Sequence, residues 1–348
     1  MKAILQTILQ ACFSLFLALI LGGGLILAVG ENPLQVYGIL LKGALGSKDG
    51  IGYSLFYATP LIFTGLAVAF GFRGGLFNIG GEGQLYVGAF AAAWIGLTFP
   101  TLPSFLLLPL SILSAFLAGA IWGAIPGILK ARLGVHEVIN TIMMNFLASG
   151  LVNYLVTYPY RAPGDMIPQT VEIPTSSRIP RMSFLLAPLG IDFPERVPFN
   201  AAFILALFVS FLIYLFLWKT RWGYEVRAVG LNPLASRYAG INVTWVTIIT
   251  MTVSGGLAGL VGVHEVLGYR YRYYDHFSPG YGFLGIAVAL LGRNHPLGVC
   301  LSALLFGVLM RGGLYLDVVT EHISKDIVEI LQALLILVVA SEKLFAKR

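Results

Sequence analysis

Charged residues, cysteines and nucleotide-binding loops are all scarce or missing in this sequence. Asp, Glu, Lys and Arg make up only 11% of its 348 residues, against roughly 25% in an ordinary soluble domain. The two cysteines, Cys12 and Cys300, lie in apolar stretches where a thiol behaves as a small hydrophobe, which excludes a disulfide framework. No G-x-x-x-x-G-K-[ST] pattern occurs, so the chain has no phosphate-binding loop with which to hydrolyse ATP.

Long apolar blocks are what the sequence has in abundance. Hydrophobic residues make up 57% of the chain, and the mean hydropathy is +0.85. The blocks are about as long as the ~20 residues that a helix needs to cross ~30 Å of hydrocarbon. The pattern predicts an all-α polytopic membrane protein of about ten transmembrane helices, with residues 1–348 forming a single transmembrane domain. The predicted spans cover residues 8–29, 52–71, 84–99, 104–129, 138–157, 199–218, 243–263, 281–292, 296–311 and 326–342.

The basic residues indicate how the chain is oriented in the membrane. The formal charge is +6, and the 22 Lys and Arg sit in short segments between apolar blocks, as in membrane proteins, so the charge does not indicate a nucleic-acid partner. An even number of spans puts both termini on one side, and twelve of the 22 fall on that side. Four of the other ten lie in one long loop, which counts little in the positive-inside rule. We therefore expect both termini to be cytoplasmic.

Residues 158–198 form a proline-rich connection that this orientation places outside. Eight of the chain's 17 prolines fall between Tyr158 and Phe199, and a helix cannot continue through them. Loops of this length are often functional in compact proteins. Two interpretations stay open from the residues alone: an inert connector, or an outer platform for a partner protein.

Residues 219–242 form a polar segment expected on the cytoplasmic face. Asn232 is a favoured N-cap, Pro233 a favoured first-turn residue, and Gly240 suits a helix end. The sequence therefore predicts a short helix over Pro233–Ala239, between two spans. This helix is either a docking element for a soluble partner or an ordinary interfacial helix.

A glycine-rich stretch over residues 72–85 interrupts the apolar pattern. It contains five glycines and four polar residues, so we expect the helix to break there. Lipid does not tolerate such a break unless the freed backbone groups face protein or a watery cavity, and broken helices mark solute pathways in transporters. A tight turn between closely packed helices is the alternative. The candidate pathway residues are Phe77, Asn78, Glu82, Gln84 and, from the fifth span, Asn145.

A second interrupted stretch echoes the first. Residues 280–284 match residues 81–85 in the pattern G-x-G-x-L. The span count puts the two on opposite sides of the membrane, as an inverted repeat requires, whereas a chance match among 41 glycines is the alternative. On the fifth span Asn145 and Asn153 share a helix face. They either hydrogen-bond a solute or hold helices together.

Two His-Glu pairs occur in identical G-V-H-E-V pentapeptides. They are His136-Glu137 and His264-Glu265, and neither has a second His four residues further on. The metalloprotease pattern is therefore excluded. We expect both pairs to be polar residues at helix ends, with no catalytic and no metal site on this chain.

Three stretches resemble the permease family of ABC importers that serves branched-chain amino acids, ribose-type sugars and nucleosides. They are G-L-F-N-I-G-G-E-G-Q at 75–84, R-A-V-G-L-N-P-L-A-S-R-Y-A-G-I at 227–241 and G-F-L-G-I-A-V-A-L-L-G-R-N-H-P-L-G at 282–298. The span pattern resembles that of the family over nearly the whole chain, and the residues of these stretches look most like those of the nucleoside branch. The R-N-H-P at 293–296 departs from the smaller residues expected there.

The resemblance implies the permease subunit of an ATP-driven nucleoside importer in a bacterial cytoplasmic (inner) membrane. Ribose-type sugars or branched-chain amino acids are the alternative solutes. No cofactor is expected on this chain, since a cytoplasmic ATP-binding subunit would use ATP and Mg. The other implied partners are a second permease of different sequence and an extracytoplasmic substrate-binding protein or lipoprotein, which would dock on residues 158–198. The coupling role would fall to Glu225, Arg227, Asn232, Pro233, Ala235 and Gly240.

Two other functions stay open from the residues alone. An ion-coupled secondary transporter needs buried carboxylates, for which Asp317 and Asp326 are the nearest candidates. A membrane enzyme acting on lipid or polyprenol needs clustered polar side chains at an interface. The run from Arg270 to His276 is the stretch crowded enough to provide them.

Overall fold

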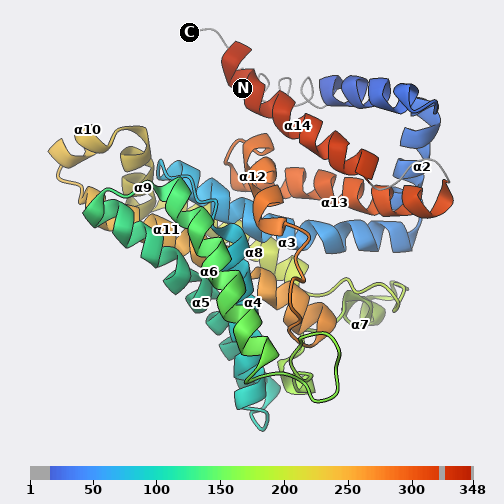
Figure 1. The fold of residues 1–348 in the computed structure, drawn as a ribbon, viewed down its shortest axis with the longest axis horizontal. Helices are drawn as coiled ribbons and strands as arrows, with labels where there is room; N and C mark the ends of the chain where they lie inside the picture. The colour runs from blue at the N-terminus through green and yellow to red at the C-terminus, as the bar shows by residue number, and fades with distance from the viewer. Residues whose placement is uncertain (1–15, 321–325, 346–348) are drawn as a thin grey trace. The chain divides into compact units, whose positions relative to one another are not determined.

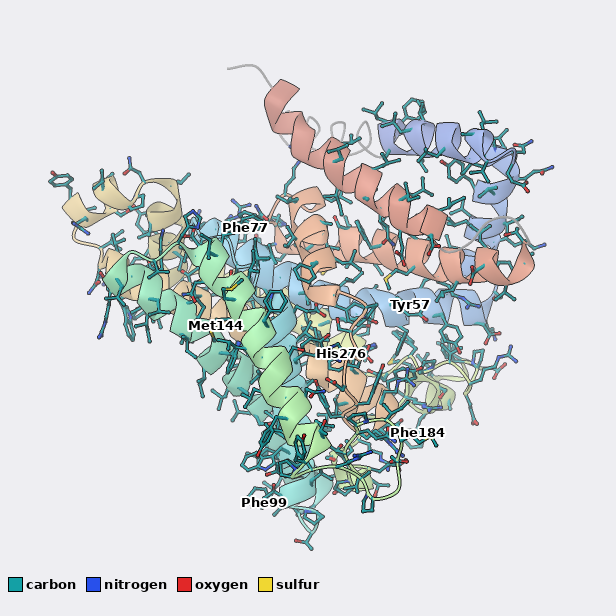
Figure 2. All side chains as sticks on the ribbon, in the orientation of Figure 1. Tyr57, Phe77, Phe99, Met144, Phe184 and His276 are labelled. Carbon is teal, nitrogen blue, oxygen red and sulfur yellow. The ribbon has the colours of Figure 1, made fainter. Side chains whose placement is uncertain are left out.

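The computed structural model describes residues 16–320 and 326–345 (Figure 1), and its side chains are drawn in Figure 2. Within these residues the only regular secondary structure is helical, apart from two isolated β-bridges, which confirms the predicted all-α class. Lys2, Cys12 and the first part of the predicted span 8–29 lie outside the described residues.

The helices follow one another along the chain with short connections, except between α6 and α8. Their bounds are α2 (Pro33–Leu45), α3 (Lys48–Arg73), α4 (Gly81–Thr98), α5 (Ser104–Leu133), α6 (Glu137–Thr157), η1 (Thr175–Ser177), α7 (Met182–Leu186), η2 (Ala187–Leu189), α8 (Ala202–Lys219), α9 (Arg221–Leu231), α10 (Pro233–Tyr238), α11 (Val243–Gly259), η3 (Val263–Arg270), α12 (Tyr281–Leu291), α13 (Pro296–Val319) and α14 (Asp326–Phe345).

Six described helices are long and apolar enough to cross a membrane, or seven if the bent pair Phe16–Ala28 and Pro33–Leu45 counts as one span. The six are α3, α5, α6, α8, α11 continued through η3, and α13, and each coincides with a predicted span. The predicted spans 84–99, 281–292 and 326–342 are also helical, as α4, α12 and α14. However, α12 has only 11 residues, about 16 Å at 1.5 Å per residue. The polytopic membrane class is therefore supported, while the count of ten stays a prediction.

Helix α2 is absent from the sequence-based prediction, which expects a loop there. Asn32 caps the helix by accepting a hydrogen bond from the Leu34 N–H at 2.9 Å, and Pro33 is its first residue. This is the same Asn-Pro signal that predicts the helix at Pro233. The axis of α2 is bent by 114° from that of Phe16–Ala28.

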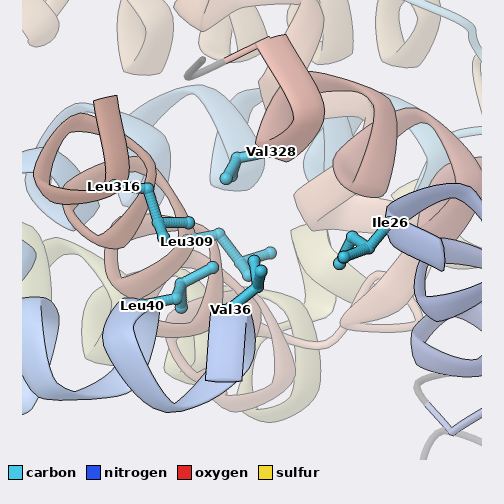
Figure 3. Packing of buried hydrophobic residues seen from close by; sticks show 6 residues of the cluster. All are labelled: Ile26, Val36, Leu40, Leu309, Leu316 and Val328. Atoms are coloured by element: carbon cyan, nitrogen blue, oxygen red, sulfur yellow. The ribbon is translucent and has the colours of Figure 1, made fainter. Parts of the chain in front are cut away.

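The chain divides into two compact units, residues 1–58 with 301–348 (unit 1) and residues 59–300 (unit 2). The core of unit 1 is an aliphatic cluster shown in Figure 3. It consists of Ile26, Val36, Leu40, Leu309, Leu316 and Val328. A Cβ added at Gly43 of α2 would lie 2.3 Å from the Tyr315 ring, so glycine lets that ring pack directly against the helix.

Small residues hold α4, α5 and α11 together in unit 2. A Cβ at Gly119 would lie 2.4 Å from the Gly255 carbonyl oxygen, and one at Gly255 would lie equally close, 2.4 Å, to that of Gly119. A Cβ at Gly259 would lie 2.3 Å from the Ala115 carbonyl oxygen, and one at Gly88 of α4 would lie 2.5 Å from the Gly259 Cα. Backbone-to-backbone contact of this kind is how membrane helices associate without a hydrophobic driving force.

Candidate functional site

The chain leaves helical geometry between α3, which ends at Arg73, and α4, which begins at Gly81. Gly75 has a φ of +73°, in the left-handed region that favours glycine. A Cβ at Gly74 would lie 2.6 Å from the Thr250 Cγ2 atom, so α11 packs directly on the turn. The predicted helix break is confirmed, and we call residues 74–80 the break.

Asn78 organises the break with its side-chain amide. The side chain is 1% exposed. Its nitrogen donates to Gln84 Oε1 and Ser254 Oγ, both at 2.8 Å, and its oxygen accepts from the Gly80 N–H at 2.9 Å and from Gln84 Nε2 at 3.1 Å. Ser254 in turn donates to the Ala67 carbonyl at 2.6 Å. All four hydrogen-bonding positions of the buried amide are therefore occupied, as its burial requires.

Two polar side chains of α6 satisfy backbone groups that the break frees. Asn145 accepts from the Gly83 N–H at 2.8 Å and donates to the Ile79 carbonyl at 3.0 Å. Thr141 Oγ1 accepts from the Ile79 N–H at 3.3 Å. Without water, unpaired backbone groups at these positions would be costly. Of the two interpretations of Asn145, the geometry favours helix-to-segment bonding over direct contact with a solute.

Glu82 joins the break to α12. Its Oε2 accepts from the Gly282 N–H at 2.7 Å, and its carboxylate also hydrogen-bonds Ser278 and Tyr86. A Cβ at Gly282 would lie 2.3 Å from the Glu82 nitrogen, so glycine lets the two backbones meet. The two G-x-G-x-L stretches are therefore in contact, while their placement on opposite sides of the membrane, as an inverted repeat, stays a prediction.

The candidate pathway residues thus occupy one neighbourhood in unit 2. Asn78, Gln84 and Asn145 surround the break, while Glu82 faces α12. Phe77 is half-buried and stacks on Phe72, with ring centroids 4.9 Å apart. In Figure 2, Phe77 is labelled near the start of α4 and Phe99 at its end, and His276 is labelled at an intermediate height, to the right of both.

The predicted coupling segment folds into two short helices, α9 and α10. Asn232 Oδ1 accepts from the Ala235 N–H at 3.0 Å, and Pro233 is the first residue of α10. Gly240 follows with a φ of +81°. The predicted capped helix is confirmed, and it ends at Tyr238, one residue earlier than expected.

Apolar side chains project from the turn between α9 and α10. Leu231, Leu234 and Tyr238 are 88%, 69% and 94% exposed. Exposed apolar groups clustered on a polar connection are typical of a protein-docking surface. On α9, Glu225 pairs with Arg221 at 3.1 Å and so braces one helix turn.

Trp218, at the end of α8, gathers three basic side chains. The guanidinium carbons of Arg73 and Arg227 lie 5.1 Å and 5.9 Å from its ring centroid, and the His295 ring lies 4.9 Å away. Burial, with a further effect of the Arg73 charge, lowers the pKa of His295, which favours a neutral ring. Cation–π contacts of this kind stabilise the junction where α3, α8 and α9 meet.

Arg73 also explains the unexpected R-N-H-P turn. Its guanidinium donates to the carbonyls of Asn294 at 2.9 Å and Arg293 at 3.2 Å. Both of these residues adopt a φ of +53°. A left-handed pair of non-glycine residues is uncommon, and the hydrogen bonds from Arg73 hold it in place.

Gly230 brings α9 against the break. A Cβ at Gly230 would lie 2.2 Å from the Arg73 carbonyl oxygen and 2.8 Å from the Gly75 nitrogen. Conversely, a Cβ at Gly75 would lie 2.9 Å from the Gly230 Cα. No side chain fits between the two backbones. We call this contact the glycine joint; it lies two residues before Asn232 in the sequence.

Residues 158–198 are anchored along the segment that joins η3 to α12. The Thr170 N–H donates to the Tyr273 carbonyl at 2.8 Å, and the Asp275 N–H donates to the Pro168 carbonyl at 3.1 Å. The connection therefore has a fixed backbone next to α12, which suits a platform better than a loose tether.

Glu172 adds an exposed ion-pair network to this segment. It accepts from Arg272 at 2.5 Å and from Arg178 at 3.0 Å. The hydrogen bonds from these two guanidinium groups, first that of Arg272, hold the pKa of Glu172 below its usual value of 4.5. Exposed pairs of this kind contribute little stability each.

The two His-Glu pairs have different surroundings. His136 is the N-cap residue of α6 and Glu137 pairs with Lys130 at 2.9 Å, which confirms a helix-end role. His264 and Glu265 are 0% and 4% exposed within the π-helical turn η3. The helix-end prediction is wrong for this second pair, because the π-helical turn continues the helix beyond α11 into the interior of unit 2. In the described ranges no group of three or more His, Cys, Asp or Glu could hold a metal ion.

Buried carboxylates are not where the sequence suggests. Asp317 and Asp326 are exposed, whereas Glu82 and Glu265 are 7% and 4% exposed. The two aspartates therefore do not supply the buried acids that ion coupling needs.

Ser254 and Thr141, which bond to the break, are not among the residues predicted from the sequence, since a single hydroxyl in an apolar span carries no recognisable pattern.

Comparisons with known proteins agree on one family. The family model described as branched-chain amino acid transport system / permease component matches residues 50–340. A guanosine ABC transporter permease protein of Bacillus subtilis is 39% identical over 338 residues, covering 97% of this chain and 94% of the relative. A glucose ABC transporter permease protein of Haloferax volcanii is 37% identical over 330 residues (95% and 86%). A nucleoside ABC transporter permease protein of Lactococcus lactis is 36% identical over 336 residues (96% and 91%).

Proposed function

Because the chain belongs to the branched-chain amino acid transport system / permease component family, we propose that it is the permease subunit of an ATP-driven ABC importer for nucleosides. The family match over residues 50–340 carries this conclusion, since it covers most of the chain. Two of the three relatives described are named for guanosine or nucleosides. Family membership favours a permease over a lipid enzyme or an ion-coupled secondary transporter.

A sugar is the second candidate solute. The Haloferax volcanii relative, named for glucose, is 37% identical, almost as similar as the guanosine relative. For branched-chain amino acids the support is the family description alone. Uptake of labelled guanosine, glucose and leucine by the same reconstituted complex separates the three.

In this proposal ATP hydrolysis belongs to a separate partner subunit. Without a phosphate-binding loop, it leaves ATP and Mg to a cytoplasmic ATP-binding subunit. A second permease of different sequence completes the pathway, and a substrate-binding protein or lipoprotein docks outside on residues 158–198. The chain crosses a bacterial inner membrane ten times, with both termini in the cytoplasm. In this orientation the coupling segment 219–242 faces the ATPase.

The coupling segment transmits the ATPase movement through α10 and the glycine joint. Leu231, Leu234 and Tyr238 dock in a groove of the ATPase, because they are exposed apolar groups on a capped helix. Displacement of α10 pulls α9, and Gly230 then presses on Gly75, since their backbones touch. The remaining coupling residues fix the shape of this lever: Glu225, Arg227, Asn232, Pro233, Ala235 and Gly240.

The pathway residues hold the break in its shape rather than grip the solute. The amide groups of Asn78, Gln84 and Asn145 form hydrogen bonds with other groups of the protein. Glu82 ties the break to α12, and Phe77 closes its α3 side through the stack on Phe72. A shift of the break therefore moves α4 and α12 together and opens the path for solute, as in alternating access.

A matched pair of glycine variants tests the coupling role. Gly240→Val strains a left-handed residue that has open space around it, at the end of α10. Gly30→Val imposes the same strain, again in open space, at φ +88° in unit 1. In vesicles with the ATPase and binding protein, Gly240→Val should abolish guanosine uptake while ATP hydrolysis continues, and Gly30→Val should keep uptake. Normal uptake by Gly240→Val would refute the coupling assignment.

A further inference from the structure

Helix α8 keeps a long apolar face exposed. Ile204, Leu207 and Phe211 are 51%, 42% and 54% exposed. Tyr214 and Trp218, whose rings stack on each other, continue the same face, since all five residues follow one another at spacings of three or four positions. Only 22% of the helix is buried, and it is apolar enough to cross a membrane. In a bilayer such a face meets lipid chains.

The Trp218 end of this face carries two guanidinium groups. The guanidinium carbons of Arg73 and Arg227 lie 5.1 Å and 5.9 Å from the Trp218 ring centroid, and all three residues are partly exposed. Arg73 is the last residue of α3 and Trp218 the last but one of α8, so both mark the ends of apolar helices. Helix ends of this kind lie at the depth of the lipid headgroups, where Trp is enriched. Two cations therefore lie at headgroup depth.

The two guanidinium groups lack an anionic partner within the part of the chain that the structure describes. Neither forms an ion pair there, and their charges repel each other. Arg227 Nε is buried without a hydrogen-bond partner. Arg73 uses Nε and Nη2 on two carbonyls of the R-N-H-P turn, which leaves its Nη1 for another acceptor. Because buried polar groups are seldom left unpaired, an anion from outside the chain is the partner that is missing.

We propose that Arg73, Trp218 and Arg227, which we call the Trp218 cluster, bind the headgroup of an anionic phospholipid whose acyl chain lies along the exposed face of α8. Guanidinium groups form strong charge-assisted hydrogen bonds with phosphate oxygens. Basic pockets between transmembrane helices bind anionic headgroups in other membrane proteins. The inference goes beyond the proposed function, because it requires only that α8 crosses the membrane and does not depend on the solute.

The apolar face of α8 favours a lipid over other anions. A carboxylate of a soluble partner or a free phosphate ion would satisfy the guanidinium groups, but neither would use the apolar face that ends at them. A phospholipid uses both. Its headgroup would also lie beside the glycine joint, since Arg227 precedes Gly230 by about one helix turn and the Arg73 carbonyl oxygen faces Gly230. The lipid would therefore tie α3 to α9 at the joint.

The main test measures the affinity of the transporter complex for phosphatidylglycerol, added to the complex in a neutral detergent and counted by native mass spectrometry. Arg227→Gln should weaken this affinity about tenfold, because it removes charge-assisted hydrogen bonds. Arg237→Gln makes the same change at an exposed arginine of α10 and should leave the affinity unchanged. Unchanged affinity in Arg227→Gln overturns the inference; if the same variant then releases the ATPase, the cluster is a protein contact.

Two further ligands show which part of the lipid is recognised, and both are measured on the wild type. Phosphatidylcholine with the same acyl chains should bind several-fold more weakly, because its choline cation is repelled by the two guanidinium groups. Inorganic phosphate should not displace phosphatidylglycerol, because it has no acyl chain to cover α8. Equal affinity for the two lipids, or displacement by inorganic phosphate, overturns the inference.

Photo-crosslinking places the acyl chain and covers the case in which Arg227→Gln does not assemble. Phosphatidylglycerol with a photoreactive group in its acyl chain is added to the wild-type complex at a low molar ratio, and the labelled residues are identified by peptide mass spectrometry. Labels should fall on residues 204–211 of α8, several-fold more than with the matched phosphatidylcholine. Absence of labels from this stretch, or equal labelling by both lipids, contradicts the inference.

Discussion

The two sides of the break are held in opposite ways. Toward α9, Gly75 and Gly230 touch backbone to backbone with no room for a side chain. Toward α6 and α11, the amides of Asn78 and Asn145 bond to backbone and side-chain partners. The glycine joint therefore transmits position by shape alone, whereas the amide side fixes the break by satisfying its polar groups. A variant at the joint should change how movement of α9 reaches the break as well as stability, whereas one at the amides should mainly change stability.

The largest effect is expected at Gly75, where a side chain would cause both backbone strain and steric overlap. Gly75→Val combines strain at φ +73° with overlap on Gly230. Left-handed strain costs about 1–2 kcal/mol and overpacking about 1–3 kcal/mol. We expect a thermal midpoint in detergent lower by many degrees. Gly164→Val is the matched control, at φ +83° with open space around it, and should show the strain alone. Equal midpoints for the two variants would contradict a tight joint.

Asn78→Leu should have an effect of comparable size. It leaves Ser254 Oγ, Gln84 and the Gly80 N–H without their partner inside the protein, and each unsatisfied buried group costs about 1–3 kcal/mol. Asn140→Leu is the control, because the Asn140 amide nitrogen is buried without a hydrogen-bond partner. Thermal unfolding should separate the two variants clearly. If Asn140→Leu is as destabilising as Asn78→Leu, the amide network does not hold the break.

The smallest effect is expected away from the break, at the exposed Glu172. Because its pKa in the folded chain is lowered from 4.5, its ion pairs stabilise at neutral pH, and this contribution is lost as the pH falls through the lowered pKa. Glu172→Gln should slightly lower the thermal midpoint at pH 7 and have no effect at a pH below that value. High salt should shrink the difference. Glu195→Gln, whose carboxylate forms no ion pair among the described residues, is the control. A difference that grows toward acid would contradict the assignment.

Local signals in the sequence predict local structure well. Asn232, Pro233 and Gly240 predict a capped helix that the structure confirms, because caps depend on neighbouring residues. The same Asn-Pro signal at Asn32 marks α2, which the sequence-based prediction leaves as a loop. The glycine-rich stretch also predicts the break correctly.

Contacts across the chain are what the sequence could not supply. The pairing of Glu82 with Gly282 joins residues 200 positions apart, and the glycine joint depends on how α9 packs. Counting apolar blocks treats α12 as a full span, although its length allows only about half a crossing. Asp275 was visible only as part of a crowded polar run, since its partner Asn153 lies on α6.

The most direct test of the account is the number of solute molecules imported per ATP hydrolysed when the glycine joint is altered. Gly230→Ala places a methyl group 2.2 Å from the Arg73 carbonyl oxygen, whereas Gly150→Ala adds one to helix α6 in open space. Both variants would be reconstituted with the ATPase and binding protein, and uptake and ATP hydrolysis measured in the same vesicles. The account predicts that Gly230→Ala keeps hydrolysing ATP but imports several-fold less solute per ATP, while Gly150→Ala matches the wild type. An unchanged ratio in an assembled Gly230→Ala complex would contradict transmission through the joint.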